Sequence, residues 1–276
     1  MIDLHTHTSE SDGSFAPASL IAEAVRVGVR VLAITDHDTL AGYDQARPLA
    51  SRAGVELLCG IELSTKLHGH SVHLLGYFPG GDGAPSGPVD FRVWLLEMQA
   101  SRRDRNVRLA ARLRDLGFDI QIEEAEALGR GMTGRPHFAQ VMANKGYVAN
   151  IREAFDRYLD ESASAYVHRL EPQFAESVER IRRAGGISSL AHPTRVSGDA
   201  AEVVKELAGQ GLQALEAYHS DHTAAETAAY LELARRNGLK VTGGSDFHGA
   251  IKPEVKLGTG CDGNLRVPPE VLEGLR

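Results

Sequence analysis

Cysteine is scarce in this chain of 276 residues, and its two cysteines, Cys59 and Cys261, are too few for a disulfide framework. No apolar run approaches the roughly 20 residues that a membrane-spanning helix needs. The formal net charge is -7, and a chain without a basic excess is a poor match for duplex DNA or anionic lipid. With no signal-peptide pattern, the sequence predicts a cytoplasmic protein that needs no membrane and no obligate protein partner.

The remaining composition is that of a folded globular protein. Hydrophobic residues make up 42% and charged residues 24% of the chain, near the average for globular domains. The length suits one large domain, or one domain interrupted by a smaller one. Histidine is the outlier, with 12 residues, and half of them fall at the ends of apolar runs.

About seven short β-like runs end in polar residues that can take part in chemistry. They span residues 2–7, 31–38, 55–64, 72–77, 187–192, 212–219 and 240–248. Helical patterns such as 17–27 and 224–237 follow several of them, and His68 and His70 flank Gly69 in a predicted hairpin loop. Alternating strands and helices predict an α/β fold with a parallel sheet closed into a barrel. Since barrel active sites lie at the C-terminal strand ends, we expect these polar residues to meet.

The alternation stops between about residues 80 and 172. Residues 80–88 are rich in glycine and proline, which is typical of a linker, and the apolar residues from Trp94 to Leu116 have helical spacing. We therefore predict a barrel formed by residues 1–79 and 173–276, with a linker and an inserted helical subdomain at 80–172 that covers the active site. A solvated helix face is expected for its arginines at positions 102, 103, 105, 108, 112 and 114.

Donors suited to metal ions recur at the strand ends. The first strand ends in His5-Thr6-His7, and both imidazoles can reach one ion because alternate side chains of a strand share a face. The full set of candidate ligands is His5, His7, Asp12, His37, Glu62, His73, His192, Asp246 and His248. An isolated pair of this kind is common by chance, but donors at six strand ends are not. A zinc site takes about four ligands, so the set predicts two or three divalent ions bridged by Glu62. Imidazole and carboxylate donors favour Mn²⁺, with Fe²⁺ or Zn²⁺ as alternatives.

Five segments resemble the four-part signature of the PHP (polymerase and histidinol phosphatase) superfamily. They are His5-Thr6-His7, Thr35-Asp36-His37-Asp38, Gly60-Ile61-Glu62, Ala191-His192-Pro193 and Ser245-Asp246-Phe247-His248. The resemblance extends over nearly the whole chain and implies a distorted (β/α)7 TIM-like barrel that hydrolyses phosphoesters with a trinuclear metal centre. It also implies the grouping of the ligands: His5, His7, Glu62 and Asp246 for one ion, Glu62, His73 and His192 for a second, and Asp12, His37 and His248 for a third.

Within the superfamily, the chain is most similar to the stand-alone 3′,5′-nucleotide bisphosphate phosphatases, also called TrpH-like or RNase AM-like proteins. Its segment Thr133-Gly134-Arg135-Pro136-His137-Phe138 resembles the Arg-Pro-His element of that branch. The resemblance implies hydrolysis of the 3′-phosphate of a small nucleotide such as pAp, with 5′-to-3′ trimming of short RNA in the same site. Arg135 and His137 would hold the second phosphate. The alternative for Arg135 is a surface residue before a helix that Pro136 starts.

Four further side chains are candidates for substrate contacts or proton transfer. Lys66 and Arg195 would add positive charge near the metal ions. Asp36 and His219 would either protonate the leaving oxygen or orient a ligand, and an orienting role is preferred for Asp36.

Two other functions compete with the bisphosphatase. The first is a phosphatase of another small phosphomonoester, such as histidinol phosphate, but a second anion-binding group at Arg135 suits a substrate with two phosphates. The second is a non-catalytic metal-binding module, which the complete set of ligands argues against.

Overall fold

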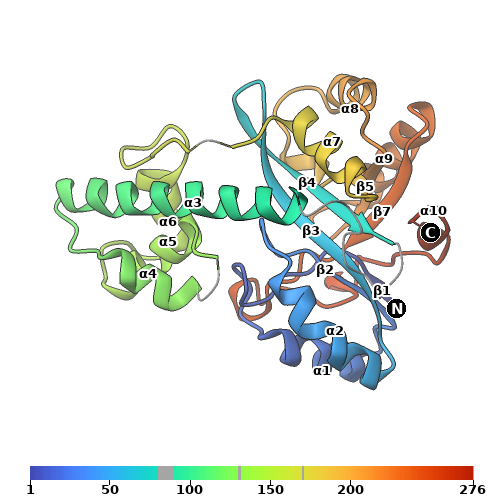
Figure 1. Cartoon of the computed structure of the whole chain (residues 1–276), viewed down its shortest axis with the longest axis horizontal. Coiled ribbons are helices and arrows are strands. Elements are labelled where there is room, and N and C mark those ends of the chain that lie inside the picture. The colour runs from blue at the N-terminus through green and yellow to red at the C-terminus, as the bar shows by residue number, and fades with distance from the viewer. Residues whose placement is uncertain (80–89, 130–131, 170, 276) are drawn as a thin grey trace.

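A seven-stranded sheet forms the centre of the computed structural model, which describes residues 1–79, 90–129, 132–169 and 171–275 (Figure 1). The strands lie in sequence order: β1 Ile2–Asp3, β2 Val31–Ile34, β3 Glu56–Leu67, β4 His70–Phe78, β5 Ile187–Leu190, β6 Ala214–His219 and β7 Lys240–Gly244. The sheet nearly closes, because Leu4 donates to the carbonyl of Gly243 at 3.2 Å. A Cβ at Gly244 would overlap the backbone of His5, so glycine permits this close approach. The predicted barrel is confirmed.

Helices cover the outside of this sheet. Pro17 opens the first of them and Gly28, at φ 83°, ends it, as expected for an N-terminal proline and a left-handed C-cap. The face with Leu20, Ile21 and Ala24 is buried. The helices around the barrel are α1 Pro17–Val27, α2 Ala41–Ala53, α7 Phe174–Arg183, α8 Ala200–Gly209, α9 Ala224–Arg236 and α10 Glu270–Leu275.

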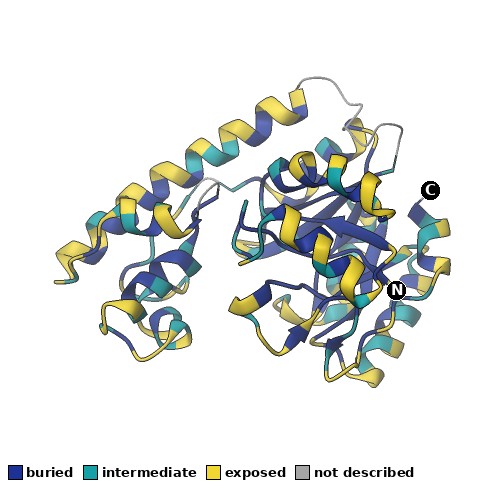
Figure 2. Cartoon of the chain, turned by 90° about the horizontal axis from the view of Figure 1, so that it is seen from below, coloured by how far each residue is buried: buried dark blue, intermediate teal, exposed yellow. Residues whose placement is uncertain are grey.

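Short elements complete the barrel. Two 3₁₀ turns, Pro193–Arg195 and Gly249–Ile251, follow β5 and β7, and a small hairpin pairs β8 Val255–Lys256 with β9 Gly260–Cys261. Figure 2 shows buried strands surrounded by helices with exposed outer faces. Within the described ranges, no helix combines the length and apolar character needed to cross a membrane.

Strand β4 runs antiparallel to both β3 and β5, so the expectation of a wholly parallel sheet is wrong at this strand. The cause is a two-residue turn at His68 and Gly69, whose φ angles are 49° and 84°, as in the type I′ turns of tight hairpins. A turn this short leaves no crossover helix between the strands. The predicted hairpin loop is thus present, and both of its histidines are exposed.

The segment between β4 and β5 is helical and extends to one side of the sheet (Figure 1). It contains α3 Asp90–Asp115, α4 Ile122–Gly129, α5 Arg135–Asn144, α6 Ile151–Ala154 and a π-helical turn Phe155–Leu159. Leu109, Leu113, Phe138 and Met142 pack in a core of their own, as a subdomain requires. The predicted linker at 80–88 lies outside the described residues, and the boundaries at 80 and 172 stay a prediction.

Candidate metal centre

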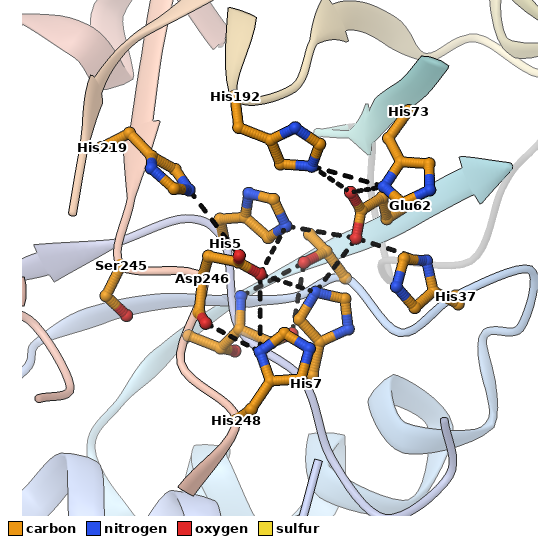
Figure 3. A network of polar contacts seen from close by, with 12 residues as sticks. His5, His7, His37, Glu62, His73, His192, His219, Ser245, Asp246 and His248 are labelled. Atoms are coloured by element: carbon orange, nitrogen blue, oxygen red, sulfur yellow. Dashed lines mark hydrogen bonds and ion pairs between the residues drawn. The ribbon is translucent and has the colours of Figure 1, made fainter. Parts of the chain in front are cut away.

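The strand ends bring the predicted ligands together at one end of the barrel (Figure 3). His5 and His7 follow β1, His37 follows β2, His192 follows β5 and Asp246 follows β7. The centroid of the His7 ring lies 5.2 Å from that of the His5 ring and 4.7 Å from that of the His37 ring. Side chains from both ends of the chain therefore share one small volume, as the position of active sites in α/β barrels predicts.

Glu62 lies between the imidazoles. Its carboxylate is surrounded by five of them at 2.8 to 3.3 Å, those of His5, His7 and His37 around Oε2 and those of His73 and His192 around Oε1. Because each oxygen faces a different group of rings, this carboxylate is placed to bridge two cations.

Groups of donors fit around single ions. In three such groups every ligand atom lies within 4.8 Å of the others: His5, His7, Glu62 and Asp246; His7, Asp12, His37 and His248; and His37, Glu62 and His73. The first group has the same members as the first ion site implied by the resemblance. His192 also lies beside His73, with Nε2 3.3 Å from its Nδ1. Donors this close can meet a cation at about 2.0 to 2.3 Å.

Two buried nitrogens support a cation at this position. Nε2 of His7 and Nδ1 of His37 have no hydrogen-bond partner among the described residues, although both face Glu62. A buried polar atom without a partner costs free energy, and a metal ion would satisfy both nitrogens. Mixed imidazole and carboxylate donors also match Mn²⁺, Fe²⁺ or Zn²⁺, so the residues present fit a divalent metal centre.

The pKa shifts of these side chains affect how they can bind a metal ion. Although burial opposes ionisation of Glu62, the surrounding imidazoles hold the pKa of this carboxyl well below its usual range. Burial lowers the pKa of His37 to about 3, which keeps its ring neutral. Burial also opposes the charge on His7, but Asp246 and Glu62 outweigh it and raise the pKa of His7 to about 9. The carboxylates are thus ionised near neutral pH, and a metal ion at His7 must displace a proton.

Glu216, in β6, is a member of the site that the sequence analysis missed. Its Oε1 lies 2.9 Å from Nδ1 of His5, and its Oε2 accepts a hydrogen bond from the backbone N–H of His192 at 2.7 Å. A carboxylate on the far nitrogen of a ligating imidazole fixes its tautomer and orientation. The available signal was an acid inside the apolar run 212–219.

Two candidate ligands, and the residue that follows a third, have unusual backbone conformations. Asp38, His192 and Asp246 have φ angles of 52°, 26° and 57°, a region that residues other than glycine seldom adopt. They follow β2, β5 and β7, beside or within the cluster. Strained backbone conformations persist only where the surrounding structure fixes them, and they are frequent at functional sites.

Asp36 faces the loop after β1. Its carboxylate accepts hydrogen bonds of 2.7 Å from the backbone and hydroxyl of Thr8 and from the hydroxyl of Ser11. The side chain is fully buried, and burial raises its pKa. Since this loop carries His7 and Asp12 at its two ends, the position of Asp36 favours the orienting role over protonation of the leaving oxygen.

His219 lies at the end of β6, at the edge of the cluster and beside Asp246 (Figure 3). Its Nδ1 accepts a hydrogen bond from the backbone N–H of Asp221 at 3.0 Å, and its Nε2 is 3.8 Å from Oδ2 of Asp246. The acceptor at Nδ1 places the proton of a neutral ring on Nε2. His219 is therefore a donor aimed toward Asp246, and its role in proton transfer stays a prediction.

Positive charge reaches the cluster from two side chains. Arg195 lies 3.2 Å from Oδ2 of Asp246, and Lys252, which the sequence analysis did not single out, lies 2.7 Å from the same oxygen. Lys66 instead pairs with Glu161 and, at 3.3 Å, with Glu171. Of the two side chains predicted to add positive charge, the structure therefore places Arg195 beside the candidate ligand Asp246 and pairs Lys66 with other carboxylates.

Arg135 and His137 both lie at the start of α5. Arg135 donates to the carbonyl of Leu159 at 3.1 Å, and its guanidinium lies over the rings of Phe155 and Tyr166. His137 accepts a hydrogen bond from the backbone N–H of Gly134 at 3.0 Å and so caps the helix. The helix start that Pro136 predicts is present, and both side chains contribute to its local structure.

A cavity of about 730 Å³ lies over the cluster. Candidate metal ligands line it, and so do Arg102, Arg105, Arg135 and Arg169. Arg102 and Arg105 are buried, so the predicted solvated face is wrong for these two arginines, whereas Arg103, Arg108, Arg112 and Arg114 are exposed. The reason is that the inner face of α3 is turned toward the barrel, where Arg102 pairs with Asp38.

Comparison with known proteins agrees with this geometry. A family model described as PHP domain matches residues 3–178. A 5′-3′ exoribonuclease of Haemophilus influenzae is 32% identical over 249 residues, which cover 89% of each chain. A phosphoribosyl 1,2-cyclic phosphate 1,2-diphosphodiesterase of Eggerthella lenta is 34% identical over 90% of this chain and 94% of its own.

A further sequence relative and a solved structure are also similar to this chain. A 3′,5′-nucleoside bisphosphate phosphatase of Chromobacterium violaceum is 30% identical over 90% of this chain and 87% of its own. A structure from Bifidobacterium adolescentis, described as that of a metal-dependent phosphoesterase, superposes with a TM-score of 0.86 at 28% identity and covers 99% of this chain and 94% of its own. The resemblance predicted from the motifs is confirmed, and the chain belongs to the PHP domain family of metal-dependent phosphoesterases.

Proposed function

We propose that this chain hydrolyses the 3′-phosphate of nucleoside 3′,5′-bisphosphates, converting pAp to AMP and phosphate. Trimming of short RNA from its 5′ end would be a second activity of the same site. The cavity carries this proposal, because candidate metal ligands and several arginines line it together. The ligand cluster suits the phosphate that reacts, and the arginines suit a second phosphate. The similarity to a bisphosphate phosphatase and to an exoribonuclease supports it.

In this proposal two or three divalent ions, Mn²⁺ in preference to Fe²⁺ or Zn²⁺, are held by the nine predicted ligands. They divide as His5, His7, Glu62 and Asp246; Glu62, His73 and His192; and Asp12, His37 and His248. When bound, such ions supply Lewis-acid stabilisation of the attacking and leaving oxygens in an in-line displacement. Glu216 and Asp36 would hold the ligands in orientation through the hydrogen bonds described above.

The chain's own cations and donors would act on the substrate. Arg195 and Lys252, both beside Asp246, would stabilise negative charge on the reacting phosphate. His219 would supply a proton from Nε2 toward the leaving oxygen. Arg135 would contact the second phosphate from the cavity wall, and His137 would act with it by fixing the start of α5.

A cyclic phosphodiesterase is a second candidate, because the relative from Eggerthella lenta is 34% identical to this chain. Its name describes a phosphoribosyl group that carries a cyclic phosphate, and such a substrate also has two phosphates on one ribose. The arginines that line the cavity suit both substrates, so the two candidates differ in the ester that is cleaved.

A comparison of substrates tests the proposal. Phosphate release or product formation would be measured with Mn²⁺ and pAp, AMP, phosphoribosyl 1,2-cyclic phosphate, histidinol phosphate or 5′-phosphorylated short RNA. We expect the highest kcat/KM for pAp. A preference for the cyclic diester or for histidinol phosphate would overturn the assigned substrate, and failure to cleave any of them with any divalent ion would favour a non-catalytic module.

A further inference from the structure

Arg105, in α3, is a buried cation without a carboxylate partner. It is 5% exposed and lines the cavity. Within the described ranges its guanidinium makes one hydrogen bond, from Nε to Oδ1 of the neighbouring Asn106 at 3.0 Å, and no carboxylate lies within ion-pair distance. The remaining N–H groups of this side chain are therefore available to a molecule in the cavity.

The neighbouring arginines are engaged by the protein. Arg102 pairs with Asp38 and donates to the hydroxyl of Ser64 at 2.9 Å. Arg169 lies 3.2 Å from Asp38 and 2.9 Å from Glu171. Both guanidinium groups therefore have their counter-charges within the fold, which distinguishes them from Arg105.

The surroundings of Arg105 are unfavourable for a cation. Burial, together with the nearby charges of Arg102 and Arg169, lowers the pKa of Arg105 to about 8. A buried charge is unfavourable unless it is paired, and an anion in the cavity would provide the pairing. A phosphate monoester fits best, because the planar fork of a guanidinium binds two phosphate oxygens at once.

We propose that Arg105 joins Arg135 in binding the phosphate that is not hydrolysed, and that it selects substrates with a second phosphate monoester on the ribose. The identity of the ligand rests on the proposed function, whereas the presence of an anion site rests on the burial and the missing partner of Arg105. Arg102 and Arg169 add to the positive field of this site without giving up their carboxylate partners.

Binding of AMP to the full chain loaded with Mn²⁺ tests the site, because AMP is the product of the proposed reaction and carries the phosphate that is retained. Calorimetry would compare AMP, inorganic phosphate and adenosine with wild type, Arg105→Gln and Arg105→Lys. We expect Arg105→Gln to weaken AMP binding about tenfold or more and to leave adenosine unchanged. Arg105→Lys would recover part of the affinity, because it keeps the charge and loses the fork.

Arg103→Gln is the matched control. Arg103 lies on the same helix, but its side chain is 66% exposed and pairs with Glu126, so AMP binding should not change. Thermal unfolding without ligand provides a second readout. Arg105→Gln should not lower Tm, since it removes an uncompensated charge, whereas a purely structural arginine would lower it.

Kinetics separate this inference from the proposed function. Arg105→Gln should raise KM for pAp and leave KM for a small phosphomonoester such as p-nitrophenyl phosphate unchanged. Wild-type affinity for AMP and wild-type kinetics on pAp in this variant would overturn the anion site and leave the bisphosphatase intact. Arg105-dependent binding of AMP without hydrolysis of pAp would sustain the anion site and refute the proposed reaction.

Discussion

Asp246 divides its two carboxylate oxygens between different partners. Oδ1 lies 3.5 Å from Nε2 of His5 and 3.4 Å from Nε2 of His7. Oδ2 faces Arg195 and Lys252. Oδ1 thus faces the imidazoles, where a metal ion would bind, while the side chains of Arg195 and Lys252 hold Oδ2. These contacts fix the carboxylate in one orientation.

Removing a ligand on either side of the first ion site should abolish catalysis. We expect His7→Ala and Asp246→Ala each to reduce kcat/KM on pAp by at least about a thousandfold, because several kcal/mol of transition-state stabilisation depend on the ion. Initial-rate assays at saturating Mn²⁺ measure the loss, and circular dichroism checks that the fold is kept. Activity within tenfold of wild type in either variant would contradict the ligand assignment.

Glu216→Gln should affect the metal site without removing a ligand. Loss of the carboxylate beside Nδ1 of His5 should lower metal affinity about 10- to 100-fold, and high Mn²⁺ should restore much of the activity. Isothermal titration with Mn²⁺ measures the affinity. Glu273→Gln, on the exposed side of α10, serves as the control, and equal affinities in the two variants would rule out the orienting role.

Most of the candidate metal ligands could be predicted from the sequence because they lie at or just after the ends of recognisable apolar runs, although Glu62 and His73 lie inside β3 and β4. Glu216 could not, since it lies inside such a run and its partners come from β1 and the end of β5. Lys252 and Arg105 were missed because their surroundings depend on how a loop and a long helix pack against the barrel. Which side chains are left unpaired is a tertiary property that spacing along the chain does not contain.

At the scale of elements, Asp38 connects the barrel to the helical segment. It follows β2, accepts a hydrogen bond from the backbone N–H of Ser64 in β3 at 2.8 Å, and pairs with Arg102 of α3 and with Arg169. Although burial opposes ionisation, these arginines hold the pKa of Asp38 well below its usual range. The contact joins the residue after the candidate ligand His37 to the arginines that line the cavity.

Asp38→Asn should destabilise the protein by about 3 to 5 kcal/mol, because it leaves two buried guanidinium groups without a shared carboxylate. Chemical denaturation measures the change in free energy of unfolding. Asp44→Asn breaks the exposed pair with Arg92 and should cost about 1 kcal/mol or less. Similar losses in both variants would show that Asp38 does not support the junction.

Element predictions succeeded where the signal was local. Pro17 and Gly28 mark the ends of α1, and Gly69 marks the hairpin between β3 and β4. The direction of β4 departed from the parallel pattern because a two-residue turn overrides the alternation of strands and helices seen elsewhere. Strand β1 is short, Ile2–Asp3, since the chain after Asp3 leaves the regular ladder to present its histidines.

At the scale of the whole molecule, metal binding should contribute to folding stability. The ligands come from positions 5 to 248 of the chain, so an unfolded chain cannot gather them around an ion. A ligand that binds only the folded state stabilises it by about 2.7 kcal/mol at 100 times its Kd. Removal of metal with EDTA should therefore lower Tm by several degrees, and added Mn²⁺ should restore it.

Differential scanning fluorimetry across a Mn²⁺ titration measures this effect, and His7→Ala should show a smaller shift. A Tm that does not respond to chelation or to Mn²⁺ in the wild-type protein would mean that the strand ends do not form a binding site that depends on the fold.

The most direct test of the metal centre is an anomalous difference map from crystals of the full chain grown with Mn²⁺. The predicted result is two or three peaks on the two sides of Glu62, each about 2.0 to 2.3 Å from its imidazole and carboxylate donors. A map with no peak among these side chains, or with the histidines turned away from Glu62, would contradict the account.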